Sequence, residues 1–192
     1  MRKLVWFMHV SLDGFVAGPK GEMDWIRVDE EIFDYAGSNT DQADTALYGR
    51  VTWQMMDGYW PTAGSKPGAS KHDVQHSRWY NKVEKVVLSK TMAGTERPGT
   101  KFVGRDVAGE IAALKRSAGR DILMFGSPGA AHALMAENLI DDYWLFINPV
   151  ILGQGIPLFK GIKERTPLTL VASKVFSSGV ACLHYNYRGD KS

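Results

Sequence analysis

Two glycine-containing junctions in the sequence have the residue types of phosphate-binding turns. Each follows a short apolar run and precedes a segment with helical spacing. The residues concerned are Gly49, Arg50 and Thr52 at the first junction, and Gly126, Ser127 and Gly129 at the second. Free N–H groups and the helix dipole attract anions at a helix N-terminus, and glycine lets the backbone approach a phosphate closely. We therefore expect the amides of Gly49 and Gly126 to face one crevice at the sheet edge where α/β folds bind ligands.

A pair of such sites would fit a dinucleotide pyrophosphate and one further phosphate. The alternative for either junction is that its glycines serve only chain reversal, or that an anion other than a nucleotide binds there. Arg50 and Thr52 favour an anion site because they add a forked cationic donor and a hydroxyl. Neither junction matches G-x-G-x-x-G or G-x-x-x-x-G-K-[ST], which disfavours an ordinary Rossmann dehydrogenase and a P-loop NTPase.

Aromatic and histidine side chains gather in sequence near the expected crevice. Trp25 and Trp60 offer ring faces on which a flat heterocycle could stack, whereas Trp53 is better suited to the core. His72 and His76 are four residues apart, as two ligands on one helix face would be. No third ligand accompanies them, so we expect no metal site.

Composition narrows the class of protein. The chain has 192 residues, which predicts a single domain over residues 1–192. A net charge of +2 gives no reason to expect nucleic-acid binding, and the single Cys excludes an internal disulfide framework. No apolar run reaches the ~18 residues of a membrane helix. We expect a cytoplasmic protein with no membrane partner, and a frayed tail at residues 189–192.

The elements that must position these groups alternate along the chain. Strands are expected at residues 3–10, 45–48, 85–88, 101–103, 121–125 and 142–148, and a terminal hairpin at 168–176 and 180–187. Helices are expected at 30–36, 50–56, 107–118 and 129–138, and a surface loop at 58–68. Alternating strands and helices predict a three-layer α/β fold. Its sheet would be mixed, mostly parallel, with about eight strands and a C-terminal antiparallel hairpin.

Five motifs in this order carry a family resemblance. They are Ser11-Leu12-Asp13-Gly14-Phe15-Val16-Ala17, Gly49-Arg50-Val51-Thr52-Trp53, Val87-Leu88-Ser89-Lys90, Gly126-Ser127-Pro128-Gly129 and Pro149-Val150-Ile151-Leu152-Gly153-Gln154-Gly155-Ile156-Pro157-Leu158-Phe159. Over nearly its whole length the chain resembles the dihydrofolate-reductase-like superfamily. It is most similar to stand-alone versions of the reductase domain of the bifunctional riboflavin-biosynthesis deaminase/reductase.

The resemblance implies a dihydrofolate-reductase-like fold, NADPH as hydride donor and a homodimer. By position, it places Gly49, Arg50 and Thr52 at the pyrophosphate and adenosine side, and Ser89 and Lys90 near the 2′-phosphate. It places Gly126, Ser127 and Gly129 in the second phosphate loop, and Val16 and Ala17 near the nicotinamide. We assign Trp25, Trp60, Gly153 and Gly155 to substrate binding.

Three departures from the family pattern bear on the substrate. Phe125 stands where the riboflavin reductases carry an acidic residue, and Ser127-Pro128 interrupts the glycine pair. Val83 stands where dihydrofolate reductase has the Arg that binds the substrate carboxylate. The sequence thus predicts an NADPH-dependent reductase of a pyrimidine- or pteridine-like heterocycle, similar to 5-amino-6-(5-phosphoribosylamino)uracil reductase. The alternatives are a dihydrofolate reductase and a non-catalytic nucleotide-binding module.

Reduction of a C=N or C=O group also needs a proton source, for which we name three carboxylates. Asp13 follows the first strand, with an Asx-turn as the alternative role. Glu30 lies five residues after Trp25, as in dihydrofolate reductase, and would otherwise face solvent on a helix. Asp57 would otherwise end a helix. Water is a further candidate proton source, in which case catalysis would rest on positioning.

Overall fold

An eight-stranded sheet with the order β5-β4-β3-β6-β1-β7-β10-β9 organises the computed structural model, which describes residues 1–187. The strands are β1 (Leu4–Ser11), β3 (Ala43–Gly49), β4 (Glu84–Leu88), β5 (Thr100–Val103), β6 (Asp121–Phe125), β7 (Asp142–Asn148), β9 (Leu168–Val175) and β10 (Ala181–Tyr187). The pairings from β5 to β7 are parallel, and β10 is antiparallel to both neighbours. The expected mixed sheet and terminal hairpin are confirmed; the expected tail lies outside the described residues.

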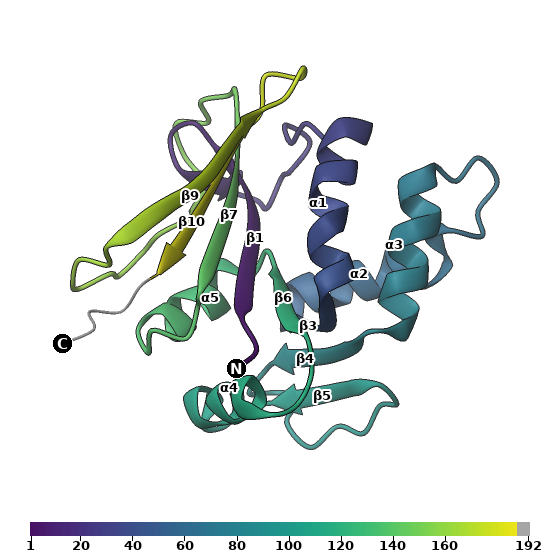
Figure 1. The fold of residues 1–192 in the computed structure, drawn as a ribbon, viewed down its shortest axis with the longest axis vertical. Coiled ribbons are helices and arrows are strands. Elements are labelled where there is room, and N and C mark those ends of the chain that lie inside the picture. The colour runs from purple at the N-terminus through teal and green to yellow at the C-terminus, as the bar shows by residue number, and fades with distance from the viewer. Residues whose placement is uncertain (188–192) are drawn as a thin grey trace.

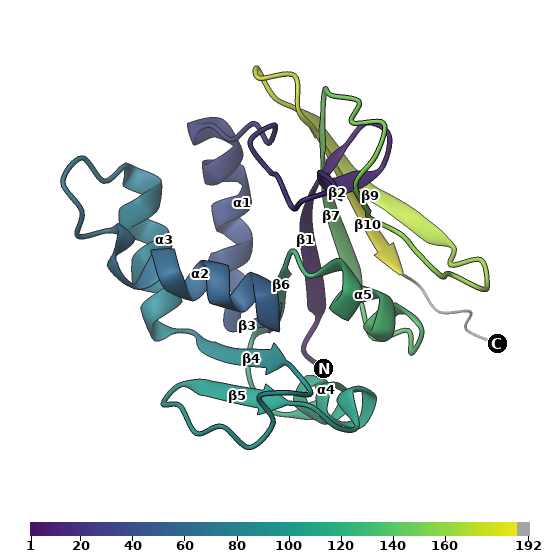
Figure 2. The ribbon, with the colours of Figure 1, turned by 180° about the vertical axis from the view of Figure 1, so that it is seen from behind.

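Five helices within residues 1–187 cover the two faces of the sheet. They are α1 (Glu30–Gln42), α2 (Arg50–Ala63), α3 (Lys71–Lys82), α4 (Val107–Arg116) and α5 (Pro128–Met135). Figures 1 and 2 show α1, α2 and α3 grouped apart from α4 and α5. Strand alternation explains this arrangement: Trp6 packs in one cluster with Ile111 of α4 and Leu134 of α5, whereas Val5 packs in another with Trp79 of α3. No helix in the described part of the chain is long and apolar enough to cross a membrane.

The helices on the face of α1 are longer than the sequence patterns indicate. Asp29 caps α1 as expected by accepting a hydrogen bond from the Ile32 amide at 2.8 Å, but the helix continues past residue 36. The prediction of a loop at residues 58–68 is wrong in its first part, because α2 continues through Gly58 and Pro61 to Ala63. Trp53, Met56, Trp60 and Ala63 recur at helical spacing and bury the same face of α2, which outweighs the breaker residues.

One helix and one small sheet were not predicted at all. Helix α3 begins with a capping box, in which Ser70 and Asp73 each bond the other's backbone amide. Strands β2 (Phe15–Ala17) and β8 (Ile156–Pro157) form a two-stranded sheet that is too short to show as a pattern. This sheet joins the first and last motifs of the resemblance beside the carboxyl end of β1.

Candidate active site

A cavity of about 880 Å³ opens at the carboxyl ends of the parallel strands, where α2 and α5 begin. This volume is in the range of cofactor pockets. All the residues expected to contact the cofactor lie along its wall. They are Val16, Ala17, Gly49, Arg50, Thr52, Ser89, Lys90, Gly126, Ser127 and Gly129. The fold therefore brings both glycine junctions to one crevice, as the sequence predicts, and we call this space the first cavity.

The amides of Gly49 and Gly126 are not free within the crevice, which corrects the expectation for these two groups. Gly49 N–H donates to Ser127 Oγ at 2.7 Å, and the Ser127 hydroxyl donates to the Phe125 carbonyl at 3.2 Å. Gly126 N–H donates to the Phe7 carbonyl at 3.2 Å. The buried Ser127 side chain thus ties the two junctions together and leaves anion binding to the amides that follow them.

Those following amides have the character of an anion site. No side chain caps the N-terminus of α2 or of α5, so the first-turn N–H groups after Gly49 and at Gly129 remain available to a ligand. A Cβ added at Gly129 would meet no atom within 4 Å, so this position faces open space. Arg50 and Lys90 are exposed cations that pair with no carboxylate among residues 1–187.

The two junctions approach each other so closely that side chains would separate them. A Cβ at Gly49 would lie 3.3 Å from Ser127 Cβ, and one at Gly126, whose φ is +55°, would lie 3.2 Å from Thr52 Cγ2. Glycine at both positions therefore sets the spacing of the two helix N-termini. Two uncapped N-termini at this spacing suit the two phosphates of a dinucleotide.

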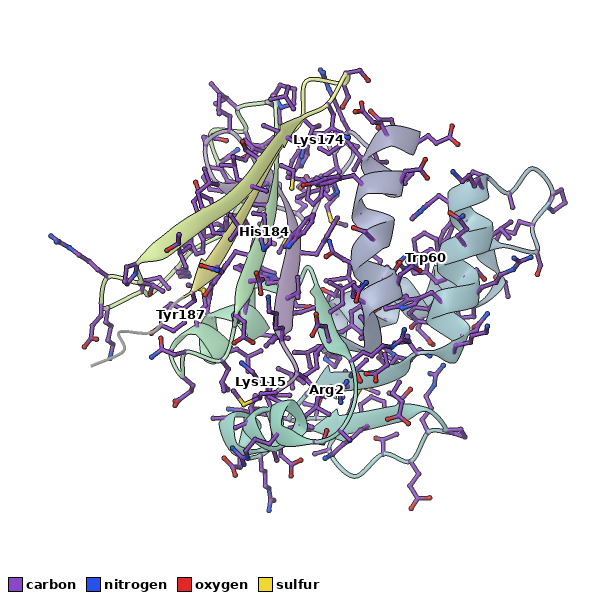
Figure 3. The ribbon with its side chains drawn as sticks, viewed as in Figure 1. Arg2, Trp60, Lys115, Lys174, His184 and Tyr187 are labelled. Atoms are coloured by element: carbon purple, nitrogen blue, oxygen red, sulfur yellow. The ribbon has the colours of Figure 1, made fainter. Side chains whose placement is uncertain are left out.

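A second cavity, of about 950 Å³, lies between α1, α3 and the sheet. It shares Phe7, His9, Met56 and Phe125 with the first cavity, so the two spaces meet at these walls. Trp60, expected at the substrate, lines this second cavity, in the region between α1 and α3 (Figure 3). Charged side chains such as Lys71 and Arg78 line it together with the rings of five Phe and Trp residues, and these rings suit a flat ligand.

Histidines in the second cavity are uncharged at neutral pH. Burial lowers the pKa of His9 to about 4 and the pKa of His76 to about 3. His72 stacks on Phe33 with ring centroids 3.6 Å apart, and His76 packs against Trp60 at 4.1 Å. Among residues 1–187 no three His, Cys, Asp or Glu side chains gather as metal ligands. The His72–His76 pair therefore contributes to an aromatic wall.

The three carboxylates expected to donate a proton line neither cavity. Asp13 accepts hydrogen bonds from the amides of Leu152, at 3.1 Å, and Gly153, at 2.7 Å. It also accepts one from the Ser11 hydroxyl, which with those amides lowers the pKa of Asp13 and favours the charged carboxylate. Asp13 therefore fastens the loop after β7 to the loop after β1. The assignment of Asp13 as a proton donor is not supported by this placement.

The other two carboxylates also make structural contacts. Glu30 is exposed in the first turn of α1, with its carboxylate 3.8 Å from Lys71 Nζ. Asp57 accepts hydrogen bonds from the Tyr80 hydroxyl, at 3.2 Å, and from Arg97, at 2.6 Å, on the side of α2 that packs in the core. Because neither side chain lines a cavity, the structure does not bring them to the candidate site.

Three residues expected at the substrate, and one expected at the cofactor, have other contacts. Trp25 Nε1 donates to the Glu22 carbonyl at 3.1 Å, while Met23 and Ile26 beside it line the first cavity. Gly155 lines neither cavity and packs against the Ala17 backbone, where an added Cβ would be 2.2 Å from the Ala17 carbonyl oxygen. Gly153 is bound to Asp13, as described above. Ser89 lines the first cavity, but its hydroxyl accepts a hydrogen bond from the Met92 amide at 3.2 Å.

Sequence reasoning missed two polar residues of the first cavity. His9 lies on β1 and lines both cavities, and Lys20 lies in the loop after β2. The one signal for His9 was its position near the carboxyl end of a strand, where α/β sheets bind ligands, and this position does not distinguish a core residue from a site residue. Lys20 had no such signal, since its loop has no periodic pattern.

The order of the strands, the paired helix N-termini and the adjoining second cavity define an α/β protein of the dihydrofolate-reductase-like class. Within this class the chain belongs to the RibD C-terminal domain family, which it matches over residues 2–182.

Relatives and solved structures agree with this assignment. The chain is 32% identical to uncharacterized protein YyaP of Bacillus subtilis (strain 168), covering 98% of this chain and 96% of that protein. It is similar in structure to a Shewanella sp. PV-4 protein provisionally named for riboflavin biosynthesis (TM-score 0.74, 22% identity, 97% and 99% coverage). It is also similar to a diaminohydroxyphosphoribosylaminopyrimidine deaminase/5-amino-6-(5-phosphoribosylamino)uracil reductase from Thermotoga maritima (TM-score 0.67, 15% identity, 97% and 57% coverage). At these identities, the two structures show a shared fold.

Proposed function

We propose that the protein is an NADPH-dependent reductase of a pyrimidine- or pteridine-like heterocycle. The observation that carries this proposal is the pair of uncapped helix N-termini on one cavity, joined through shared walls to a second, aromatic cavity. The first arrangement suits a diphosphate and the second a flat ring. Membership of the RibD C-terminal domain family and the name of the Thermotoga maritima reductase support the substrate class.

In this proposal the chain's own residues supply binding and orientation. The first turns of α2 and α5 hold the two phosphates, and Arg50 and Lys90 add positive charge at the rim. Val16 and Ala17, which the family resemblance places near the nicotinamide, also line this cavity. Bound there, NADPH would supply a hydride at its nicotinamide ring. Asp13, Glu30 and Asp57 line neither cavity. Asp34 and Asp41 line the second cavity, where Asp34 pairs with Lys71, and the proposal takes water as the source of the proton that completes the reduction.

Cofactor binding is tested by titrating the protein with NADPH and NADH while following tryptophan fluorescence and the melting temperature. We expect NADPH to quench the fluorescence and raise the melting temperature more than NADH does. Arg50→Ala removes a cation of the first cavity and should weaken NADPH binding roughly 10- to 100-fold, the loss of a charge-assisted hydrogen bond. Arg78→Ala, in the second cavity, is the matched control and should leave NADPH affinity near that of the unaltered protein. A protein that responds to neither nucleotide would refute the cofactor assignment.

Catalysis is tested separately from binding. Steady oxidation of NADPH with pterins, deaminated aminouracils or small carbonyl compounds is the result expected of a reductase. NADPH binding without turnover of any compound in the panel would favour the non-catalytic nucleotide-binding module. Stabilisation by inorganic phosphate with no preference for NADPH would favour an anion-binding protein of the same fold. The expected homodimer stays a prediction, which sedimentation of the full chain tests.

A further inference from the structure

His9 lies where the two cavities meet. The residues that line both are Phe7, His9, Met56 and Phe125, and among these His9 is the one with a polar ring. No Asp or Glu within residues 1–187 lines the first cavity. His9 is therefore the side chain of the shared wall that can form a hydrogen bond with a ligand spanning both cavities.

The hydrogen bonds of Asn148 define which nitrogen of His9 carries the proton. Asn148 is fully buried, and its Oδ1 accepts a hydrogen bond from the Arg27 amide at 2.8 Å, which fixes the orientation of the side-chain amide. Its Nδ2 is therefore a donor, with the Phe146 carbonyl at 3.0 Å, His9 Nδ1 at 3.4 Å and the Val10 carbonyl at 3.5 Å as acceptors, so His9 Nδ1 faces an N–H group. A nitrogen that accepts a hydrogen bond carries no proton, so the neutral His9 ring bears its proton on Nε2.

His9 Nε2 is left without a partner within residues 1–187, whereas Nδ1 is held by Asn148. We propose that His9 donates a hydrogen bond from Nε2–H to the oxygen or nitrogen of the carbonyl or imine that accepts the hydride. This inference rests on the proposed reductase function and narrows the substrate to a heterocycle with an uncharged hydrogen-bond acceptor at the cavity junction.

The chemistry balances with His9 remaining neutral. The acceptor carbon gains a hydride, with its two electrons, from the reduced nicotinamide, which is thereby oxidised. The π bond of the C=O or C=N group breaks, and negative charge develops on the oxygen or nitrogen. That atom accepts the Nε2–H hydrogen bond and then takes a proton from water. Burial lowers the pKa of His9 to about 4, so a neutral imidazole polarises the acceptor without becoming a proton donor.

The tautomer is measured by nitrogen-15 NMR of the histidine side chains in the full chain, without any substrate. The sequence has 5 His, and the His9 signals are those that disappear in the His9→Gln variant. We expect a neutral ring with the proton on Nε2 from pH 6 to 8. A ring protonated on Nδ1, or a cationic ring at pH 7, would overturn the inference even where NADPH binds normally.

Kinetics test the role of the donor. His9→Phe keeps the ring volume without a donor, and His9→Gln places an amide N–H near the original Nε2. On a panel compound that is turned over, we expect His9→Phe to lower kcat about 100-fold, with NADPH affinity changed less than about threefold, and His9→Gln to restore much of the rate. His132→Phe makes the same replacement at a histidine that lines neither cavity and is the matched control. Wild-type kcat in His9→Phe would overturn the inference. Failure of the unaltered protein to bind NADPH would instead overturn the proposed function.

Discussion

Replacing Lys90 with Met tests where the adenosine end of the cofactor lies. Lys90 follows β4 at the wall of the first cavity, where it is exposed and pairs with no carboxylate among residues 1–187. NADPH differs from NADH by a single phosphate on the adenosine ribose. A cation that contacts this phosphate lowers the dissociation constant of NADPH and leaves that of NADH unchanged. Ser89 beside it is neutral and its hydroxyl accepts a hydrogen bond from the Met92 amide, so the positive charge at this place comes from Lys90.

The expected magnitude follows from charge, distance and exposure. Two opposite unit charges about 4 Å apart attract by about 1 kcal/mol in water and about 4 kcal/mol at an effective dielectric constant of about 20. The Lys90 side chain is exposed, which places it near the aqueous value, and a phosphate monoester carries between about one and a half and two charges. We therefore expect a loss of about 2 kcal/mol, which is about a 30-fold rise in the NADPH dissociation constant.

Fluorescence titrations of the unaltered and variant proteins with both nucleotides measure this loss. Lys101→Met is the matched control. Lys101 lies on β5, pairs with Glu110 of α4 at 2.6 Å, and does not line the first cavity. The difference between the unaltered protein and Lys90→Met should shrink at about 1 M salt, where the screening length falls to about 3 Å. An unchanged ratio of NADPH to NADH affinity in Lys90→Met would refute this placement of the adenosine end.

Three further variants test contacts that stabilise the folded protein, the first of them beside the first cavity. Gly155→Ala should separate β8 from β2, because its Cβ would lie 2.2 Å from the Ala17 oxygen; a lower melting temperature and weaker NADPH binding are expected, and an unchanged melting temperature would contradict this. Lys115→Met removes the cation 2.6 Å from the Asp141 carboxylate, which keeps its hydrogen bond from the Leu4 amide, and should lower the free energy of unfolding in urea by about 1–3 kcal/mol; equal stability would show that the pair contributes nothing. His76 has a folded-state pKa of about 3, below its unfolded value. Unfolded chains therefore bind the proton first, and stability falls as the pH drops below about 6.5. His76→Gln should remove about 3 kcal/mol of this loss at pH 4.5, and parallel pH profiles of unfolding would argue against it.

Sequence patterns predicted those elements whose own residues show an apolar run or a helix cap. The strand before each glycine junction was predicted from a short apolar run, and the Asp29 cap located the start of α1. Contacts between distant segments carried no such signal. Asp57 was a candidate acid by sequence, but Tyr80 and Arg97 bond it from other elements, and it lines neither cavity.

The same limit applies to the candidate site. The sequence indicates that glycines and anion-binding residues follow β3 and β6, and the fold brings them to one cavity. It does not indicate that His9 faces that cavity with its tautomer set by Asn148, 139 residues away in the chain. Histidine in an apolar strand has the same local pattern whether it packs in the core or lines a site, so only the tertiary structure distinguishes the two.

The Ser-Pro insertion in the second junction shows how a departure from the family pattern can preserve the site. Ser127 adopts a left-handed conformation with φ at +57°, which is unfavourable for a residue with a side chain. The hydrogen bond from Gly49 to its hydroxyl offsets that cost and fastens the first junction to the second. Pro128, at the first position of α5, lacks an N–H and has a backbone angle suited to a helix start. The Ser127 hydroxyl thus joins the two junctions where glycine could not, and the amide of Gly129 stays open to an anion.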